Sequence, residues 1–288
     1  MTFVLTAGLE VLAGISSLVL VALGLAIVFG MMRVINLAHG EFLMLGAYTA
    51  ITAVNHGVNF YIAILFIAPL TVGLIGLIVE RLVIRHLYGR IVDTMLATWG
   101  LSLLFVGLTT TIFGNTTTGI SSPIGAVTIG NANVSGYKFF IIGVAVVIIV
   151  LLMLLLRKTE FGLIARATMQ NPTMASAVGV DPKRTYAVTF ALGAALAGLA
   201  GGVMAPITGI VPGIGTSFVA KAFITVIGGG ASVMVGTLTA STIFGTVNQV
   251  ASFLTTPVLG EVAMLLAAVL LVRLMPQGIT GRFFRGSI

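Results

Sequence analysis

The sequence has 288 residues, of which 58% are hydrophobic and only 7% are charged. A mean hydropathy of +1.20 excludes a soluble domain, because one core cannot hide that much apolar surface. The formal net charge of +7 fits basic loops on the cytoplasmic side of a membrane, and we expect no nucleic-acid partner. Long apolar stretches interrupted by glycine predict an all-α, polytopic protein in the lipid bilayer, with one transmembrane domain over 1–288.

About nine membrane spans are expected, with a range of eight to ten if one segment is re-entrant. Their approximate limits are 8–31, 34–54, 60–79, 91–113, 138–156, 185–205, 216–227, 231–253 and 258–274. The segment 114–136 contains no Lys or Arg, which indicates an external loop. An external N-terminus and an internal C-terminus place 12 of the 14 Lys and Arg on the cytoplasmic side. Small residues in the first span predict that another helix packs closely against it, at Ala22, Gly24, Ala26 and Gly30.

A polar segment separates the first two spans, and the backbone is expected to break between Arg33 and Gly40. Polar groups at membrane depth are costly, so they usually face a partner, a bundle interior or a water-filled path. We predict that Asn36 and His39, with Gly40 and Glu41, line the substrate path or its gate, or else cap the helix ends. Glu41 could also hold the broken backbone or pair with Arg33.

A weak internal repeat accompanies this break. The pattern Gly40-x-x-x-Met44-x-Gly46-x-x-Thr49-Ala50 recurs from Gly230 to Ala240. If the repeat is real, each half of the chain contains a broken helix, which in transporters built from repeats points to the substrate path.

Further polar or aromatic residues lie inside apolar stretches and are candidates for the substrate path. They are Asp93, Thr94, Trp99, Lys221 and Asn248. Each could instead make an interhelical hydrogen bond. A channel or secondary transporter acting alone would need a coupling-ion site, for which Glu41, Asp93 and Lys221 are the candidates.

The cytoplasmic loop 157–184 is expected to contain two short helices. Residues 159–170 have helical spacing, Asn171 and Pro172 form an N-cap and a first helical residue, and Gly179 is a plausible stop. An interfacial helix needs a face of large apolar side chains, which the small residues of this segment do not provide: Thr173, Ala175, Ser176 and Ala177. We therefore expect this loop to dock into a partner.

The sequence lacks the motifs of an enzyme. No Gly-x-x-x-x-Gly-Lys-Ser/Thr loop is present, and the motifs Gly-x-Ser-x-Gly and His-Glu-x-x-His are also missing. We expect no catalytic residue, metal site or cofactor on this chain, so that any ATP hydrolysis occurs on another subunit.

Two motifs resemble those of permeases of the branched-chain amino acid ABC importer family, some of whose members carry urea or short amides. The first is Gly24-Leu-x-x-x-x-Gly30 followed by Ile35-Asn-Leu-Ala-His-Gly-Glu-Phe-x-x-Leu-Gly-Ala-Tyr48. The second is Arg166-Ala-x-x-x-Asn-x-x-x-Ala175-x-x-x-Gly179, which continues into Phe190-Ala-Leu-Gly-Ala-Ala-Leu-Ala-Gly-Leu-Ala-Gly201. Met174-Ala-Ser stands where other importer classes have a Glu-Ala-Ala signature.

The resemblance implies a permease in the bacterial cytoplasmic membrane that moves a small solute by alternating access. It implies a second related permease, two cytoplasmic ATPase subunits that bind ATP and Mg²⁺, and an extracytoplasmic binding protein. It also implies that the loop 157–184 is the coupling element, whose contacts with the ATPase are expected at Arg166, Gln170, Asn171, Pro172, Ala175 and Gly179. The expected substrate is a branched-chain or other amino acid, with urea or a short amide as the alternative.

Overall fold

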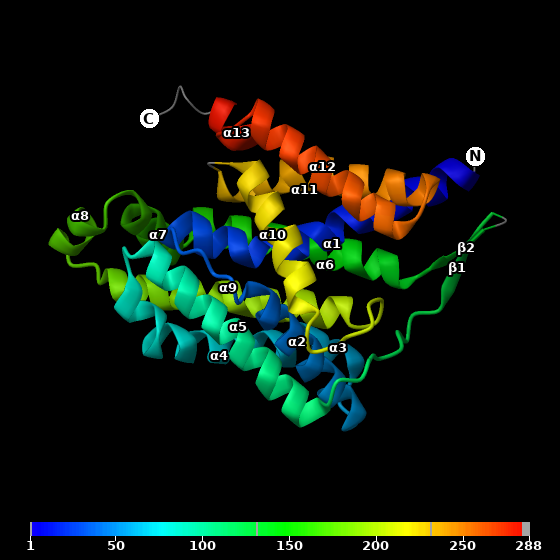
Figure 1. Cartoon of the computed structure of the whole chain (residues 1–288), viewed down its shortest axis with the longest axis horizontal. Coiled ribbons are helices and arrows are strands. Elements are labelled where there is room, and N and C mark those ends of the chain that lie inside the picture. The colour runs from blue at the N-terminus through cyan, green and yellow to red at the C-terminus, as the bar shows by residue number, and fades with distance from the viewer. Residues whose placement is uncertain (1, 131, 231, 284–288) are drawn as a thin grey trace. The chain divides into compact units, whose positions relative to one another are not determined.

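A computed structural model describes residues 2–130, 132–230 and 232–283, and nearly all regular elements in these ranges are helical (Figure 1). The longer helices are α1 (Thr2–Met32), α2 (His39–Asn55), α4 (Ala68–Leu82), α5 (Ile91–Phe113), α6 (Tyr137–Lys158), α9 (Pro182–Met204), α10 (Gly215–Gly229), α11 (Val233–Leu254) and α12 (Pro257–Leu274). The shorter helices are α3 (Phe60–Ile62), the π-helix η1 (Ala63–Ile67), the 3-10 helix η2 (Ile84–Leu87), α7 (Glu160–Gln170), α8 (Pro172–Ala177) and α13 (Gly278–Phe283). The all-α prediction is confirmed.

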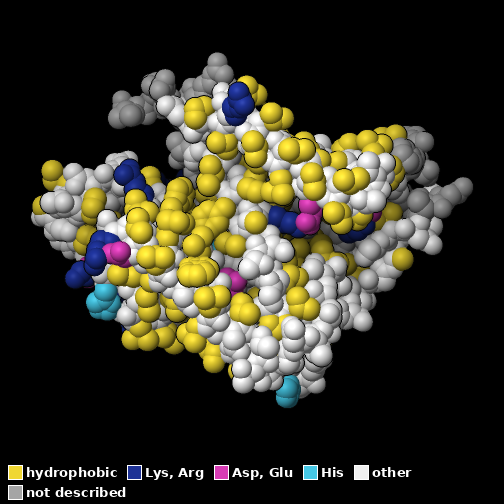
Figure 2. All heavy atoms as spheres, in the orientation of Figure 1, with side chains coloured by type: hydrophobic (Ala, Val, Ile, Leu, Met, Phe, Trp, Pro, Cys, Tyr) yellow, Lys and Arg dark blue, Asp and Glu magenta, His cyan; other side chains and the backbone are white. Residues whose placement is uncertain are grey.

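Six of the described helices are long and apolar enough to cross a membrane, and the bent pair α10–α11 makes a seventh if it counts as one span. α2 has only 17 residues, fewer than the roughly 20 that a straight span needs. The structure thus confirms a polytopic helical membrane protein, whereas the expected count of nine spans is not confirmed. Figure 2 shows hydrophobic side chains spread over much of this face, with few charged ones among them.

The chain forms two compact units. We call Leu23–Ser121 with Val150–Ala220 the central unit, and Met1–Ala22, Ser122–Ile149 and Lys221–Ile288 the terminal unit.

α9 organises the central unit, because three of its glycines each meet a different helix. A Cβ on Gly193 would come within 2.8 Å of the Gly24 carbonyl oxygen on α1, and one on Gly198 within 2.7 Å of Val72 Cβ on α4. A Cβ on Gly201 would overlap the Leu43 carbonyl oxygen on α2. Only glycine permits such close backbone approach. The predicted close packing at Gly24 is therefore confirmed, and Figure 1 shows α2, α4 and α9 side by side.

In the terminal unit α11 packs along α12. Its buried cluster consists of Leu18, Ala240, Phe244, Met264 and Ala268. Two glycines of this unit again mark close helix contacts: a Cβ on Gly245 would lie 2.9 Å from Ile15 Cα, and one on Gly260 would overlap the Ser252 hydroxyl.

The predicted backbone break is confirmed. α1 ends at Met32, Arg33 has a φ of 53°, and α2 begins at His39. Left-handed backbone is strained for a residue with a Cβ, so the chain turns here at the expense of local strain.

The segment predicted as an external loop contains a hairpin that the sequence analysis missed. β1 (Ala126–Ile129) and β2 (Ala132–Ser135) pair antiparallel, with Val127 opposite Val134. In the central unit, Thr118 and Ile210 exchange two backbone hydrogen bonds of 2.9 and 2.8 Å. These bonds tie the segment after α5 to the segment after α9.

Candidate functional site

Hydrogen bonds to α5 hold the break between α1 and α2. The Leu37 amide donates to Thr98 Oγ1 (3.1 Å), and this hydroxyl has two acceptors in reach, the Ile35 carbonyl oxygen (3.3 Å) and the Met95 carbonyl oxygen of its own helix (3.0 Å). Within the break, Asn36 Oδ1 accepts from the Ala38 amide (3.1 Å). Asn36 is 2% exposed, so its side chain caps backbone in this structure. Its predicted role at the path or gate stays a prediction.

His39 and Gly40 begin α2 and are tightly packed. His39 is buried, and a Cβ on Gly24 of α1 would come within 3.0 Å of its ring Cε1. A Cβ on Gly40 would overlap the carbonyl oxygen of Gly215 at the start of α10. Glycine at position 40 therefore allows the first turns of α2 and α10 to meet.

Glu41 is the candidate path residue whose polar atoms are least satisfied. Its side chain is fully buried beside Ser102 of α5, yet neither carboxylate oxygen has a hydrogen bond of ordinary geometry among the described residues. A Cβ on Gly215 would lie 2.7 Å from Glu41 Oε1. A buried carboxylate without donors is costly as an anion, and such groups occur at functional sites. The predicted path role therefore remains open for Glu41.

The three predicted path residues on α5 have different environments. Asp93 Oδ2 lies 2.5 Å from Arg90 Nε in a partly exposed ion pair. Thr94 is buried and its hydroxyl donates to the Arg90 carbonyl oxygen (2.8 Å), which closes the first turn of α5. Trp99 is 56% exposed. The structure thus does not bring these three residues together with Glu41.

Lys221 and Asn248 belong to the terminal unit. Lys221 Nζ lies 2.5 Å from Glu261 Oε1 on α12. The Asn248 carbonyl oxygen would be 2.7 Å from a Cβ on Gly260, so this part of α11 contacts α12 closely. The sequence analysis missed Glu261, although an acidic residue just inside an apolar stretch is itself a signal.

A second charged cluster that the sequence analysis missed lies at the end of α4. Glu80 is fully buried, accepts a hydrogen bond from the Tyr88 hydroxyl, and has its Oε1 3.6 Å from Arg85 Nε. Burial, and then the adjacent Glu80 carboxylate, raise the pKa of Tyr88, so this phenol stays a hydrogen-bond donor. The Tyr88 ring also packs against Tyr186 of α9, with ring centroids 4.9 Å apart. This cluster fixes the loop 83–90 to the helices of the central unit.

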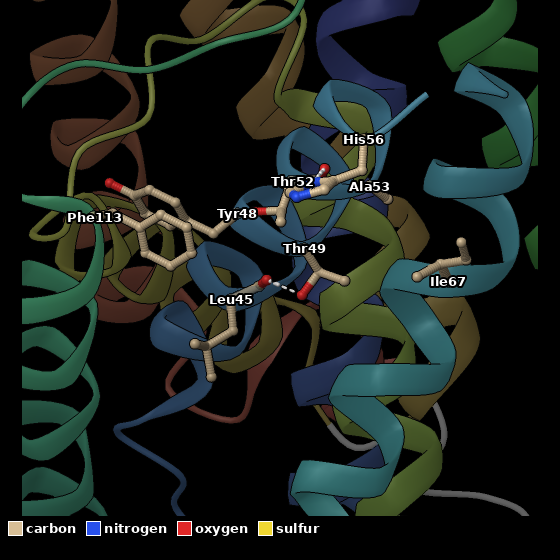
Figure 3. A pocket seen from close by; sticks show the side chains of 8 residues that line it. All are labelled: Leu45, Tyr48, Thr49, Thr52, Ala53, His56, Ile67 and Phe113. Atoms are coloured by element: carbon tan, nitrogen blue, oxygen red, sulfur yellow. Dashed lines mark hydrogen bonds between the residues drawn. The ribbon is translucent and has the colours of Figure 1, made fainter. Parts of the chain in front are cut away.

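A pocket of about 400 Å³ lies beside the second half of α2 (Figure 3). Its lining is mainly apolar, and the Tyr48 ring stacks on Phe113 with centroids 4.6 Å apart. The Thr49 hydroxyl donates to the Leu45 carbonyl oxygen (2.7 Å), the bond drawn in Figure 3. The lining residues are Leu45, Tyr48, Thr49, Thr52, Ala53, His56, Ile67 and Phe113. Those on α2 recur every three or four residues, a helical periodicity that could have identified them from the sequence.

The two helices predicted in the loop 157–184 are present, with the predicted N-cap at Asn171 and an N-cap at Thr159 that the sequence analysis did not predict. The Thr159 hydroxyl accepts from the Gly162 amide (3.2 Å) at the start of α7, and Asn171 Oδ1 accepts from the Met174 amide (3.0 Å) at the start of α8. Gly179 follows α8 with a φ of 89°.

Several residues predicted to contact an ATPase are accessible in this hairpin. Gln170, Asn171, Pro172 and Gly179 are exposed, Arg166 is half-buried, and Ala175 is buried. Three large apolar side chains are also exposed here: Leu163 (63%), Met174 (62%) and Val178 (76%). Apolar side chains grouped on a small polar hairpin are typical of a protein-binding surface.

Known proteins are similar to this chain over nearly its whole length, and they belong to one class of protein. A family model described as the permease component of the branched-chain amino acid transport system matches residues 8–275. The probable branched-chain amino acid transport permease protein LivH of Methanocaldococcus jannaschii is 31% identical over 92% of this chain and 88% of its own length. The high-affinity branched-chain amino acid permeases LivH of Escherichia coli and BraD of Pseudomonas aeruginosa are 27% and 28% identical, each over 93% of this chain and 92% of their own length.

A solved structure, PsaBC from Streptococcus pneumoniae in complex with Fab, is similar in fold. The TM-score is 0.51 at 14% identity, over 96% of this chain and 93% of the other. At this identity the likeness concerns the fold alone.

Proposed function

The chain belongs to the family of branched-chain amino acid transport permeases, and on that premise we propose that it is the membrane subunit of an ATP-driven importer of branched-chain amino acids. The importer would comprise a second related permease, two cytoplasmic ATPases that bind ATP and Mg²⁺, and an extracytoplasmic binding protein. Substrate would cross by alternating access, in a cytoplasmic membrane with the N-terminus outside and the C-terminus inside.

The hairpin α7–α8 is the observation that carries this proposal. Its two side-chain caps define its geometry, while Leu163, Met174 and Val178 remain exposed. A rigid hairpin with an accessible apolar surface can transmit the movement of an ATPase to the helices on either side of it, α6 and α9.

The similarity to three branched-chain amino acid permeases favours this substrate class over urea or short amides. The pocket beside α2 also suits an aliphatic group, because apolar side chains dominate its lining. A transporter acting alone is the less favoured class, since the matching family and the curated relatives are permease components of transport systems.

The coupling role can be tested with two matched glycine variants. Gly179 and Gly89 both have left-handed φ values, 89° and 80°, and neither has an atom within 4 Å of an added Cβ. Leucine at either position therefore adds a similar backbone strain of about 1–2 kcal/mol. The transporter with all its subunits is reconstituted in vesicles, and leucine uptake and ATPase stimulation by the loaded binding protein are measured.

Gly179→Leu should reduce both quantities about tenfold, a typical coupling effect between distant sites, while Gly89→Leu should leave them near the wild-type level. Equal effects of the two substitutions would refute the coupling role. Uptake by the isolated chain, driven by an ion gradient, would refute the importer.

A further inference from the structure

The ion pair between Lys221 and Glu261 is unusually placed. Lys221 lies about two turns into α10, and Glu261 about one turn into α12, so both charges are within helices that are otherwise strongly apolar. Their side chains are 30% and 53% exposed, although Lys221 Nζ and Glu261 Oε1 are only 2.5 Å apart. Exposed charges within apolar helices need water or polar partners, so this pair faces an environment other than lipid chains.

Packing fixes the backbone on both sides of the pair while the charged ends stay accessible. The hydroxyl of Thr225, one turn after Lys221, is buried and donates to the Lys221 carbonyl oxygen (2.8 Å). Gly260, directly before Glu261, packs so closely on α11 that a Cβ would overlap the Ser252 hydroxyl. The backbone that carries the two charges is therefore fixed by packing, while the side-chain ends can exchange partners.

A second ion pair in the same unit provides a contrast. Lys138 pairs with Glu10, but Lys138 is the second residue of α6, and the two side chains are only 27% and 29% exposed. Lys138 can reach the membrane surface from the end of α6, and Glu10, the ninth residue of α1, is less exposed than Glu261 (29% against 53%). Lys221 is too far into its helix for that explanation to be sufficient.

We propose that Lys221 and Glu261 form a contact site for the zwitterionic end of the transported amino acid. The α-carboxylate would pair with the Lys221 ammonium and the α-ammonium with the Glu261 carboxylate. One protein ion pair would thus be exchanged for two pairs with the substrate, with no change in net charge. This inference rests on the proposed function, and it specifies a substrate class, since uncharged urea or amides would gain no such pairing.

The surface around Glu261 suits the rest of such a substrate. Val258 and Leu265 lie about one turn before and after Glu261 on α12, and they are 72% and 44% exposed. An aliphatic side chain can contact this surface while the charged end binds the ion pair.

The test compares variants of the whole reconstituted transporter. Single neutralisation leaves an unpaired charge and can simply impair folding, so the decisive variant is the double substitution Lys221→Met with Glu261→Gln. The matched control is Lys138→Met with Glu10→Gln. Uptake of radiolabelled leucine and ATP hydrolysis stimulated by the loaded binding protein are measured together, and folding is checked by thermal unfolding in detergent.

The double variant at Lys221 and Glu261 should fold and keep its stimulated ATPase activity, but leucine uptake per ATP should fall about tenfold or more, as expected when charge-assisted contacts are lost. The control double variant at Lys138 and Glu10 should keep the wild-type ratio of leucine uptake to ATP hydrolysis. A wild-type ratio in both variants would mean that the pair is purely structural and would overturn the inference, leaving the importer function intact. If wild-type vesicles show no ATP-driven leucine uptake, the proposed function itself fails.

Discussion

A helix break in each unit is held by the hydroxyl of a threonine from a helix distant in sequence. In the central unit, Thr98 of α5 accepts from the Leu37 amide, and its proton is shared between the carbonyl oxygens of Ile35 (3.3 Å) and Met95 (3.0 Å). In the terminal unit, Thr280 of α13 accepts from the Ser232 amide (3.1 Å) and donates to the Gly229 carbonyl oxygen (2.6 Å). A hydroxyl can do both because it carries one donor and two acceptor sites.

The two breaks differ in how their left-handed residue is accommodated. Arg33 has a φ of 53° and an exposed side chain. At the first break the backbone is therefore strained, but the side chain of the strained residue meets no close packing. Gly230 has a φ of 83°, and an added Cβ would lie 2.6 Å from the Gln277 carbonyl oxygen and 3.0 Å from Gly278 Cα. The second break is therefore closed by backbone packing, and the first is held mainly by hydrogen bonds.

The largest effect is expected from Gly230→Ala. Its Cβ would overlap backbone that cannot move aside easily, in addition to the left-handed strain, so the free energy of unfolding should fall by about 3 kcal/mol. Gly57→Ala is the matched control, because Gly57 has a φ of 86° and nothing within 4 Å of an added Cβ. Thermal unfolding in detergent measures both. If Gly230→Ala and Gly57→Ala lower the free energy of unfolding equally, the close contact between Gly230 and Gly278 does not contribute to stability.

A smaller effect is expected from removing either threonine hydroxyl. Thr98→Val and Thr280→Val should each lower the free energy of unfolding by about 2 kcal/mol, since a part-buried backbone amide loses its acceptor and a backbone carbonyl loses a donor. Thr189→Val is the control: Thr189 is equally buried, but its hydroxyl bonds only to the Thr185 carbonyl oxygen of its own helix (2.8 Å). If Thr189→Val is as costly as the other two, the hydroxyls at the breaks have no special role.

Local signals explain which parts of this structure could be predicted. The fourth expected span, 91–113, has the limits of α5, because a long apolar stretch ends there at glycine. The break after Met32 and the caps at Thr159 and Asn171 also follow from residues close in sequence. The count of spans could not be predicted, since length and hydropathy do not show that α2 is only 17 residues long.

Contacts between residues distant in sequence account for what was missed. Thr98 lies 61 residues from Leu37, and Lys221 lies 40 residues from Glu261, so no periodicity could connect them. Glu41 was predicted as a path candidate, but its full burial beside Ser102 and Gly215 depends on how α2, α5 and α10 meet. The internal repeat stays a prediction, although each copy of the motif adjoins the start of a helix, α2 or α11.

The smallest effect concerns the strain at Arg33. Arg33→Gly should relieve a left-handed strain of about 1–2 kcal/mol, while the more flexible unfolded chain takes back about 0.5–1 kcal/mol. The net expectation is a gain of about 0.5–1 kcal/mol in the free energy of unfolding, measured in detergent as a higher melting temperature. Arg33→Ala is the control, because it removes the same side chain and keeps the strain. A gain with alanine as large as with glycine would locate the effect in the arginine side chain, and the first break would then carry no backbone strain.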